Sequence, residues 1–443
     1  MPNTAQARAE AVRDEPVLAL WRHVFGNRRM GALLLLGFAS GLPLALSGGT
    51  LQAWLTVQGV SLKDIGFATL IGQAYVFKFL WAPLMDRVEL PWLAPRLGRR
   101  RAWLVPVQAL LALVLLGMAW RGVPPAGGGV GLAPMVALAV ALAFLSASQD
   151  IVIDAYRTDV LPAEERGAGA AVLVLGYRSA MIVSGGLALW LASTWLGWRG
   201  TYALMGALMG AAVLATLWAP PPPGHVAAPS SLVAAVVEPA REFLARRGAL
   251  ALLAAIVLYK LGDAFAGALS TTFLIRGAGY SPAVVGLTYK SMGLASTIVG
   301  ALLGGGLLAR LGLWRALVLF GIAQGAANLA YWGLAVLPPN LTLMASAVGI
   351  ENLTSGMGTA AFVAWLSALC DARFSATQFA LLSALAAVGR VYVGPVSGLL
   401  AAHWGWPAFY LFSVAASAPG VLMLLWLRPV IDWQERAHAP LDA

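Results

Sequence analysis

The chain has 443 residues, of which 60% are hydrophobic and only 11% are charged, and its formal net charge is +10. A soluble domain carries about 25% charged residues, so this composition excludes a water-soluble globule and predicts a surface covered largely by lipid. The basic residues lie between apolar stretches, which argues against nucleic acid as a partner. A single cysteine, Cys370, excludes an internal disulfide, and the four histidines lie at span ends or in tails. We therefore expect no metal and no cofactor.

Twelve apolar segments follow one another along the chain. A bilayer offers no water to satisfy backbone polar groups, so helices are the default spanning element, and each needs about 20 mostly apolar residues. We place the spans at residues 30–56, 65–85, 102–121, 132–156, 167–195, 200–219, 249–274, 282–308, 314–336, 341–369, 376–401 and 406–427. The sequence thus predicts an all-α membrane protein with twelve transmembrane helices, whose main partner is the lipid bilayer.

Lys and Arg residues are distributed unevenly between the connections. With a cytoplasmic N-terminus, 20 of the 29 Lys and Arg residues lie in cytoplasmic segments, whereas four lie in the opposite loops and five inside spans. Cytoplasmic connections are enriched in these residues, so we expect both termini in the cytoplasm. Residues 1–29 carry charges of both signs, and the first apolar segment is long enough to remain as a span. This is not the pattern of a cleaved signal peptide.

Two motifs occur once in each half of the chain. The pattern Gly-x-Ser-x4-Gly begins at Gly59 and again at Gly279, and Arg178 precedes Ser-Gly in span five as Arg390 does in span eleven. The repeat predicts two pseudo-symmetric six-helix bundles, over residues 30–219 and 249–428. A cytoplasmic linker is expected over 220–248, with cytoplasmic tails over 1–29 and 429–443. The linker starts with four prolines and becomes amphipathic, so it is either a plain connection or a surface helix.

Nine ionisable side chains fall inside the predicted spans, where charges are costly and are candidates for function. They are Lys78, Asp150, Asp154, Arg178, Lys260, Asp263, Lys290, Glu351 and Arg390. Lys78 and Asp150 lie at matching depth on spans two and four, roughly 10–12 Å from the cytoplasmic face at 1.5 Å per residue, so we predict a buried ion pair. Arg178, Lys260, Glu351 and Arg390 lie nearer the midplane, and Lys260 can contact Asp263 three residues along the same helix. The alternative is that the charges only pair and hold helices together.

Two groups of motifs resemble known families. Asp86-Arg87 followed by Gly98-Arg99-Arg100-Arg101 resembles the signature loop of the major facilitator superfamily, whose fold has two six-helix halves related by a parallel repeat. A second set of segments is similar to the AmpG-type muropeptide permeases, over a range of about residues 31–428. These segments are 37–45, 72–81, 146–154, 158–170, 175–178, 258–265, 351–353 and 374–384.

The resemblance implies a bacterial inner-membrane symporter. It would use the proton gradient to import N-acetylglucosaminyl-anhydro-N-acetylmuramyl peptides for cell-wall recycling, by alternating access. We expect a monomer with this small-molecule substrate as its partner, and no enzymatic activity. One alternative is a transporter of another large anion, such as acetyl-CoA. The others are a membrane-embedded glycosyl- or acyltransferase, which would need a catalytic acid, histidine or metal at a membrane face, and a sensor that does not transport.

The implied substrate carries several carboxylates on its peptide and many hydroxyls and amides on its sugars. Cations and hydrogen-bonding side chains are therefore the expected binding residues, namely Gln149, Tyr177, Arg178, Lys260, Lys290, Asn352 and Arg390. Helix–helix hydrogen bonds are the alternative for Gln149 and Asn352. Trp54, Trp81, Trp365 and Tyr392 are candidates to stack on sugars, unless they lie at the lipid interface. The expected proton carriers are Asp150, Asp263 and Glu351, because a cation that approaches or leaves a carboxyl changes its protonation.

The loop after span two is predicted to be a cytoplasmic gate. Asp86 would face the N-terminus of span eleven, since a helix N-terminus attracts an anion, and the nearby basic residues would pair with Asp154. The predicted gating and structural ion pairs comprise Lys78, Asp86, Arg87, Arg99, Arg100, Arg101, Asp154 and Arg157.

Overall fold

The computed structural model describes residues 27–125, 131–162, 165–222, 232–246, 248–371 and 375–429, apart from the side chains of 86, 87, 232–236, 290, 375 and 376. This part of the chain is almost entirely helical and contains no strand. Helix ends follow from local chemistry. Asn340, for example, accepts hydrogen bonds from the backbone N–H groups of Thr342 and Leu343 at the start of one span, and glycines with positive φ, such as Gly98 and Gly312, precede two others.

The first half contains six rods of helix. Their elements are α3 (Arg28–Ser47) with α4 (Gly49–Val57); α5 (Leu62–Ala68), η1 (Thr69–Gly72), α6 (Gln73–Phe77), η2 (Lys78–Leu80) and α7 (Ala82–Arg87); then, after the short α8 (Ala94–Leu97), α9 (Arg99–Arg121); α10 (Ala133–Val160); α11 (Arg166–Met181), the π-helix η4 (Ile182–Leu187) and α12 (Ala188–Thr194); and α13 (Gly197–Trp218). The second rod is thus broken into short pieces.

The second half repeats this plan after the linker helix α14 (Leu232–Leu244). Its elements are α15 (Ala249–Tyr259), α16 (Leu261–Ala268), α17 (Ser270–Thr272) and the π-helix η5 (Phe273–Gly277); α18 (Pro282–Val285), the π-helix η6 (Gly286–Met292) and α19 (Gly293–Leu311); α20 (Leu313–Val336); α21 (Leu341–Ala368); α22 (Ser375–Ala415); and α23 (Ala418–Trp426). Gly405, with φ of 74°, bends α22, so that the segment contains the end of one span and the start of the next.

The observed helices match the twelve predicted spans to within a few residues. Nine helical segments in the described ranges are long and apolar enough to cross a membrane, and the longest, Thr377–Trp426, contains two spans. The other two are the interrupted second rod and α21. Large apolar side chains such as Leu113, Leu250 and Leu302 are more than half exposed on the outside, as expected of a surface that faces lipid. The chain is a multi-pass membrane protein.

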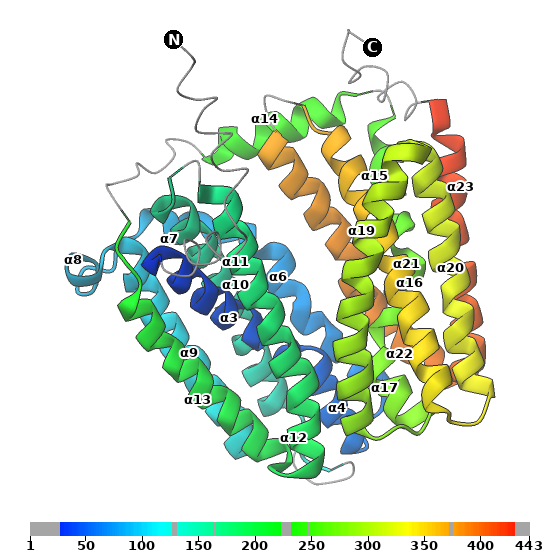
Figure 1. Cartoon of the computed structure of the whole chain (residues 1–443), viewed down its shortest axis with the longest axis horizontal. Coiled ribbons are helices and arrows are strands. Elements are labelled where there is room, and N and C mark those ends of the chain that lie inside the picture. Colours follow the sequence, from blue (N-terminus) through cyan, green and yellow to red (C-terminus); the bar gives the residue numbers. More distant parts are fainter. Residues whose placement is uncertain are drawn as a thin grey trace, which may run out of the picture.

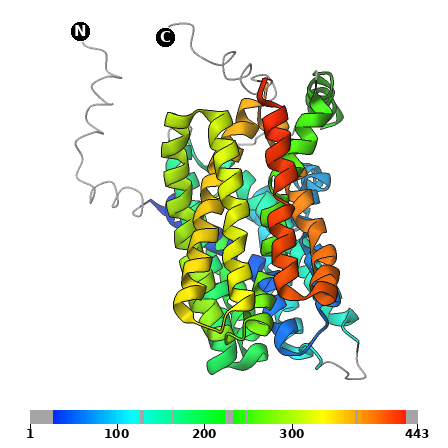
Figure 2. The same cartoon turned by 90° about the vertical axis from the view of Figure 1, so that its right-hand side faces the viewer.

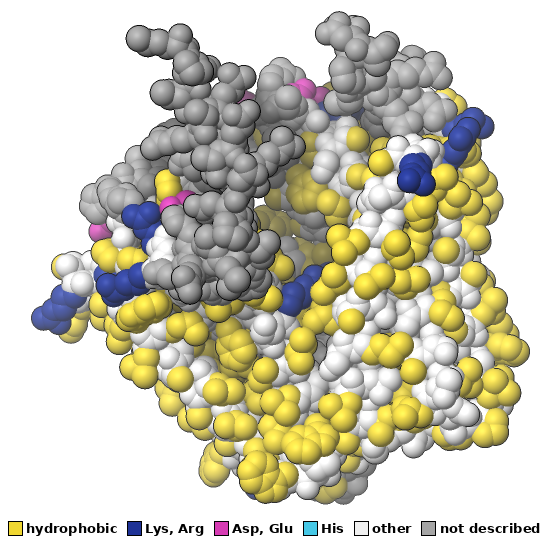
Figure 3. Space-filling view, in the orientation of Figure 1, with side chains coloured by type: hydrophobic (Ala, Val, Ile, Leu, Met, Phe, Trp, Pro, Cys, Tyr) yellow, Lys and Arg dark blue, Asp and Glu magenta, His cyan; other side chains and the backbone are white. Residues whose placement is uncertain are grey.

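The two six-helix bundles stand side by side, and they lie closer to each other at one end than at the other (Figure 1). Helix α14 crosses one end, which we call the α14 face. Seen from the side, the rods of the second half run from this face to the opposite one (Figure 2). Contacts between the halves join α5 to α22, α4 to α17, α12 to α18 and η4 to η6. These elements lie toward the opposite face, whereas the surface is hollowed between the halves at the α14 face (Figure 3).

The linker helix is tied to the second bundle by polar contacts. The Gln378 amide donates hydrogen bonds to the Pro239 carbonyl (3.0 Å) and to the Glu242 carboxylate (2.5 Å). Arg246 binds the same carboxylate at 2.7 Å and the Leu369 carbonyl at 2.5 Å. The hydrogen bond from Arg246 holds the pKa of Glu242 below its ordinary value. The surface-helix alternative for the linker is therefore the one that the structure contains over residues 232–244.

Candidate functional site

Glycines close the gap between the halves at the face opposite α14. A Cβ added to Gly66 of α5 would lie 2.6 Å from the Gly394 carbonyl oxygen and 3.0 Å from the Gly398 Cα of α22. On the other side of the pseudo-twofold axis, a Cβ on Gly286 would lie 2.6 Å from the Gly186 carbonyl oxygen. The backbones of the two halves thus touch directly at two crossings, and a larger residue at either one requires the helices to separate.

Hydrogen bonds reinforce these crossings. Arg276 of η5 donates to the backbone carbonyls of Thr56 (2.7 Å) and Val60 (2.8 Å) of the other half. The Gln52 amide donates to the Ala268 carbonyl at 2.8 Å, and the hydroxyls of Thr56 and Thr272 lie 2.9 Å apart. Together the glycine crossings and these four bonds form what we call the closed gate. The conformation is therefore open at the α14 face and sealed opposite it.

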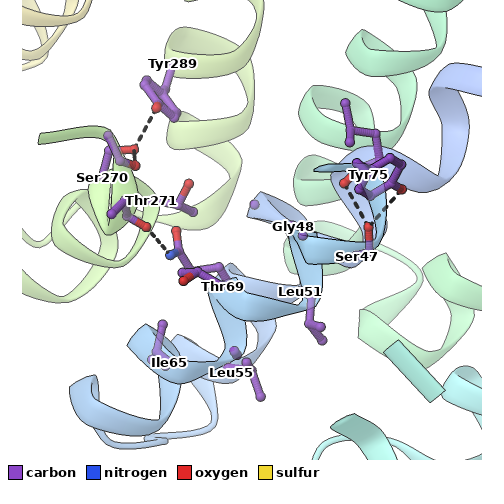
Figure 4. A pocket seen from close by; sticks show the side chains of 17 residues that line it. Ser47, Gly48, Leu51, Leu55, Ile65, Thr69, Tyr75, Ser270, Thr271 and Tyr289 are labelled. Carbon is purple, nitrogen blue, oxygen red and sulfur yellow. Dashed lines mark hydrogen bonds between the residues drawn. The ribbon is translucent and has the colours of Figure 1, made fainter. Parts of the chain in front are cut away.

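Directly behind the closed gate lies a cavity of about 280 Å³, which we call the neutral chamber. Its walls come from both halves and include Ser47, Gln52, Tyr75, Ser270 and Tyr289 (Figure 4). The Tyr289 hydroxyl lies 2.6 Å from the Ser270 hydroxyl, and the Tyr75 hydroxyl lies 3.4 Å from that of Ser47. None of the described residues that line it carries a formal charge.

A second cavity, of about 440 Å³, is lined by residues of the second bundle, namely Lys260 and residues of α16, α21 and α22. We call it the charged chamber. Lys260, Asp263, Glu351 and Arg390 line it, so four of the nine ionisable residues singled out in the sequence come together here. Gly267 and Ala268 line both chambers, which makes the two cavities contiguous.

Lys260 is the centre of the polar contacts in the charged chamber. It lies at the break between α15 and α16, and its ammonium donates to the Gln324 and Thr359 side chains, each at 3.1 Å. The same group lies 3.5 Å from the Asp263 carboxylate, which also accepts a hydrogen bond from Ser355 at 3.2 Å. The predicted contact between Lys260 and Asp263 is thus present, and both side chains remain partly exposed to the chamber.

The Glu351 carboxylate has a different environment. It accepts a hydrogen bond of 2.6 Å from the Asn352 amide, whose own oxygen accepts one from Thr297. No described cation lies within ion-pair distance of Glu351, whereas Asp263 has Lys260. Asn352 does not line either chamber, so its amide links helices and orients Glu351. The helix–helix hydrogen bond given as the alternative for Asn352 is thus present, and its contact with substrate stays a prediction.

Asp150 of the first half lies apart from both chambers and does not form the predicted ion pair. Its carboxylate accepts a hydrogen bond of 2.5 Å from Ser40 of α3. Lys78 lies close enough to attract this carboxylate electrostatically but not within 4.0 Å of it, because its rod breaks into a 3-10 turn at Lys78. The two side chains are thus near each other without forming an ion pair, and the rod that carries Lys78 is broken at that residue.

The remaining predicted substrate residues are Tyr177, Arg178, Arg390, Gln149 and Lys290. Tyr177 lies within electrostatic range of Arg178, its neighbour in sequence, and of Arg390 from the other half, so both repeat-related arginines lie near this tyrosine. In the described part of the chain, no carboxylate lies within ion-pair distance of either arginine. Gln149 is fully buried and donates to the Ala39 carbonyl at 2.8 Å, which is the helix–helix hydrogen bond given as its alternative, and its role in substrate binding stays a prediction. The side chain of Lys290 lies outside the described set.

The aromatic residues proposed to stack on sugars are mostly packed elsewhere. Trp54 and Trp365 are 2% and 0% exposed in the bundle cores, and Trp81 donates to the Ser148 hydroxyl at 3.0 Å. None of these three lines a chamber, nor does Tyr392. The aromatic rings that do line the neutral chamber belong to Tyr75 and Tyr289.

The predicted cytoplasmic gate is only partly described. The side chains of Asp86 and Arg87 lie outside the described set, and Arg99 has an interaction partner. Arg100 binds Asp159 at 2.7 Å instead of the predicted Asp154, and Arg101 donates to the Leu97 and Ala219 carbonyls. Asp154, half exposed, lies 4.0 Å from Arg157 one helical turn away. The pairing of the basic residues with Asp154 is therefore corrected, since Asp159 lies one turn nearer to α9.

Sequence reasoning did not identify the closed gate or the neutral chamber. The repeat was a usable signal, because Gly66, Gly286 and Gly398, which form the crossings, all belong to the duplicated motifs. Ser47, Tyr75, Ser270 and Tyr289 gave no such signal, since hydroxyl side chains are common in membrane helices and carry no charge. Within the described ranges, no group of three His, Cys, Asp or Glu residues is placed to bind a metal ion.

Comparisons with known proteins fit this architecture. The profile of the Major Facilitator Superfamily matches residues 33–350. The "Anhydromuropeptide permease" of Escherichia coli strain K12 is 58% identical over 410 residues, which cover 93% of this chain and 82% of the relative. Among solved structures, the nucleoside transporter NupG superposes with a TM-score of 0.69 at 13% identity, over 90% of this chain and 99% of that one.

A peptide transporter, POT in complex with sulfate, superposes with a TM-score of 0.65 at 13% identity, over 91% of this chain and 94% of that one. Likeness at this level of identity concerns the fold alone. The two six-helix bundles, the duplicated motifs and the central chambers agree with the sequence match. The chain therefore belongs to the major facilitator superfamily, and within it to the family that includes the anhydromuropeptide permease of Escherichia coli.

Proposed function

We propose that this transporter carries anhydromuropeptides across the bacterial inner membrane into the cytoplasm, driven by the proton gradient. The observation that carries the proposal is the charged chamber, which Lys260 and Arg390 line. Arg178 and Arg390 have no carboxylate partner among the described residues, and Lys260 is partly exposed to the chamber. Guanidinium groups bind carboxylates with two parallel hydrogen bonds, so the cavity suits a peptide that carries several carboxylates.

The 58% identity to the anhydromuropeptide permease supports the same substrate class. Transport of another large anion, such as acetyl-CoA, is the second candidate, because the same cations would also attract phosphate groups. A membrane-embedded transferase has no support from the chambers, whose carboxylates are held by Lys260, Ser355 and Asn352.

Proton coupling is proposed to use Glu351. An ion-paired carboxylate is held in its charged form, whereas one that is surrounded by protein without a cation is more readily protonated. Asp263 has Lys260 at 3.5 Å, whereas among the described side chains Glu351 has the Asn352 amide at 2.6 Å and no cation within ion-pair distance. When substrate leaves, Lys260 and Arg390 are released to attract the Glu351 carboxylate and favour loss of its proton. Glu351 would thus exchange its proton in step with the substrate.

The direction of import follows from the proposed orientation. With the α14 face in the cytoplasm, the hollow between the halves opens inward, and the closed gate faces the periplasm. The excess of Lys and Arg in the connections on the α14 side supports this orientation.

Uptake into proteoliposomes tests the proposal. Purified protein is reconstituted, an inward-directed pH gradient is imposed, and labelled anhydro-disaccharide tetrapeptide is compared with labelled acetyl-CoA. We expect accumulation of the muropeptide that collapses when a protonophore removes the gradient. Accumulation of acetyl-CoA without muropeptide would favour the second candidate, and muropeptide uptake that is insensitive to the protonophore would refute proton coupling alone.

A further inference from the structure

We infer that the substrate binds in one orientation, with its sugar pair in the neutral chamber behind the closed gate and its stem peptide in the charged chamber. This inference rests on the proposed function and adds a sugar subsite made by Ser47, Gln52, Tyr75, Ser270 and Tyr289. It follows from the division of charge between two contiguous cavities and from the matching division of charge within an anhydromuropeptide.

The neutral chamber suits a polar ligand without charge. Each half supplies a serine from its first rod and a tyrosine from its second, and each such pair lies within hydrogen-bond distance across the wall (2.6 Å for Ser270 with Tyr289, 3.4 Å for Ser47 with Tyr75). Figure 4 shows the two tyrosines on opposite sides of the space. A hydroxyl both donates and accepts hydrogen bonds. These serine and tyrosine hydroxyls can therefore replace the hydrogen bonds between them by hydrogen bonds to the hydroxyls and amides of a sugar.

The same chamber disfavours the peptide. A carboxylate that leaves water needs a cation or several hydrogen bonds in exchange, and without them the penalty is several kcal/mol. No described residue lining the neutral chamber is charged. The aromatic faces of Tyr75 and Tyr289 instead offer apolar area, which matches the C–H faces of a pyranose ring. The neutral chamber therefore favours the uncharged sugar part of the substrate over its charged peptide.

The peptide has a suitable site on the other side of Gly267. Lys260 and Arg390 line the charged chamber, and the Lys260 ammonium is held in place by Gln324 and Thr359. Gly267 and Ala268 border both chambers, and nothing lies within 4 Å of a Cβ added to Gly267. Where the two chambers adjoin, the space beside Gly267 is thus free of described protein atoms, and the ligand would extend from one chamber to the other at this point.

Binding measurements with three ligands test this orientation. Purified full-length protein is titrated with the anhydro-disaccharide alone, the anhydro-disaccharide tetrapeptide and the free tetrapeptide. Tyr75→Phe and Tyr289→Phe should each raise the Kd of both sugar-containing ligands by the same factor, roughly 2- to 10-fold for one lost hydrogen bond. Arg390→Gln should raise the Kd of the tetrapeptide-bearing ligand roughly 10- to 150-fold and leave that of the disaccharide unchanged.

Two controls separate binding from folding. Tyr331→Phe removes a buried hydroxyl that lines neither chamber and should leave all three affinities unchanged. Ser47→Ala and Ser270→Ala serve as smaller perturbations if a tyrosine variant elutes abnormally from a sizing column. The orientation would be overturned if Arg390→Gln raised the Kd of the disaccharide as much as that of the disaccharide tetrapeptide. It would also be overturned if the tyrosine variants weakened binding of the free tetrapeptide alone. Failure of the unmodified protein to bind the full muropeptide would instead overturn the proposed function.

Discussion

Replacing Gly66 by alanine should open the closed gate. The added Cβ would lie 2.6 Å from the Gly394 carbonyl oxygen, and ordinary contact begins at 3.4 Å, so the two helices must move apart by about 0.8 Å. The three nearest atoms, this oxygen and the Cα and N of Gly398, are all backbone and cannot rotate away. Such overpacking costs about 1–3 kcal/mol. Alanine also favours the helix itself by roughly 1 kcal/mol, but this gain is the same in both conformations and cancels.

The cost therefore falls only on the conformation in which the gate is closed. A change of 1–3 kcal/mol shifts the ratio of open to closed gates by roughly 5- to 150-fold. Spin labels at the exposed Lys63 and Pro338, one in each half, allow this ratio to be measured by electron–electron double resonance, in a Cys370→Ser background. We expect a population of molecules with a longer distance between the two labels. This population should be minor in the parent protein and larger in Gly66→Ala.

The matched control is Gly72→Ala in the same rod. An added Cβ there would meet only the Val391 side chain, at an ordinary 3.7 Å, so the distance distribution should match that of the parent. Gly286→Ala, at the other crossing, should reproduce the effect of Gly66→Ala. If Gly66→Ala and Gly72→Ala give the same distribution as the parent protein, the glycine crossings do not control the gate.

Three further predictions concern ionisable groups. Glu351→Gln should abolish gradient-driven accumulation of muropeptide in proteoliposomes while sparing exchange of internal for external substrate; retained accumulation would place coupling elsewhere. Ser40→Ala and Asp150→Asn should be non-additive in thermal unfolding, with a coupling energy of roughly 0.5–3 kcal/mol, whereas additive effects would contradict their hydrogen bond. Because the hydrogen bond from Arg246 lowers the pKa of Glu242 in the folded protein, this pairing stabilises the protein above the ordinary pKa of Glu242 and is lost as the pH falls through the folded-state value. Glu242→Gln should therefore lower the Tm at pH 7 but not near pH 3, and an equal loss at both values would exclude the pairing as the cause.

The sequence by itself determined the number and limits of the spans. Lipid imposes a nearly fixed length of apolar residues on each helix, so a one-dimensional pattern is enough to place all twelve. The duplicated motifs likewise indicated two related halves, because a repeat in sequence requires no knowledge of packing. Lys260 and Asp263 were correctly paired for the same reason, since three residues on one helix always bring two side chains to the same face.

Only the tertiary structure decided which side chains meet across helices. Gln149 and Asn352 were grouped with the substrate residues, but the rotation of their helices directs both amides to neighbouring backbones and side chains. Lys78 missed Asp150 because its helix breaks at that residue. The neutral chamber joins Tyr75 to Tyr289 and the closed gate joins Gly66 to Gly398. Those contacts depend on the relative rotation and approach of two bundles, which are set by the packing of many side chains together and not by any local pattern of residues.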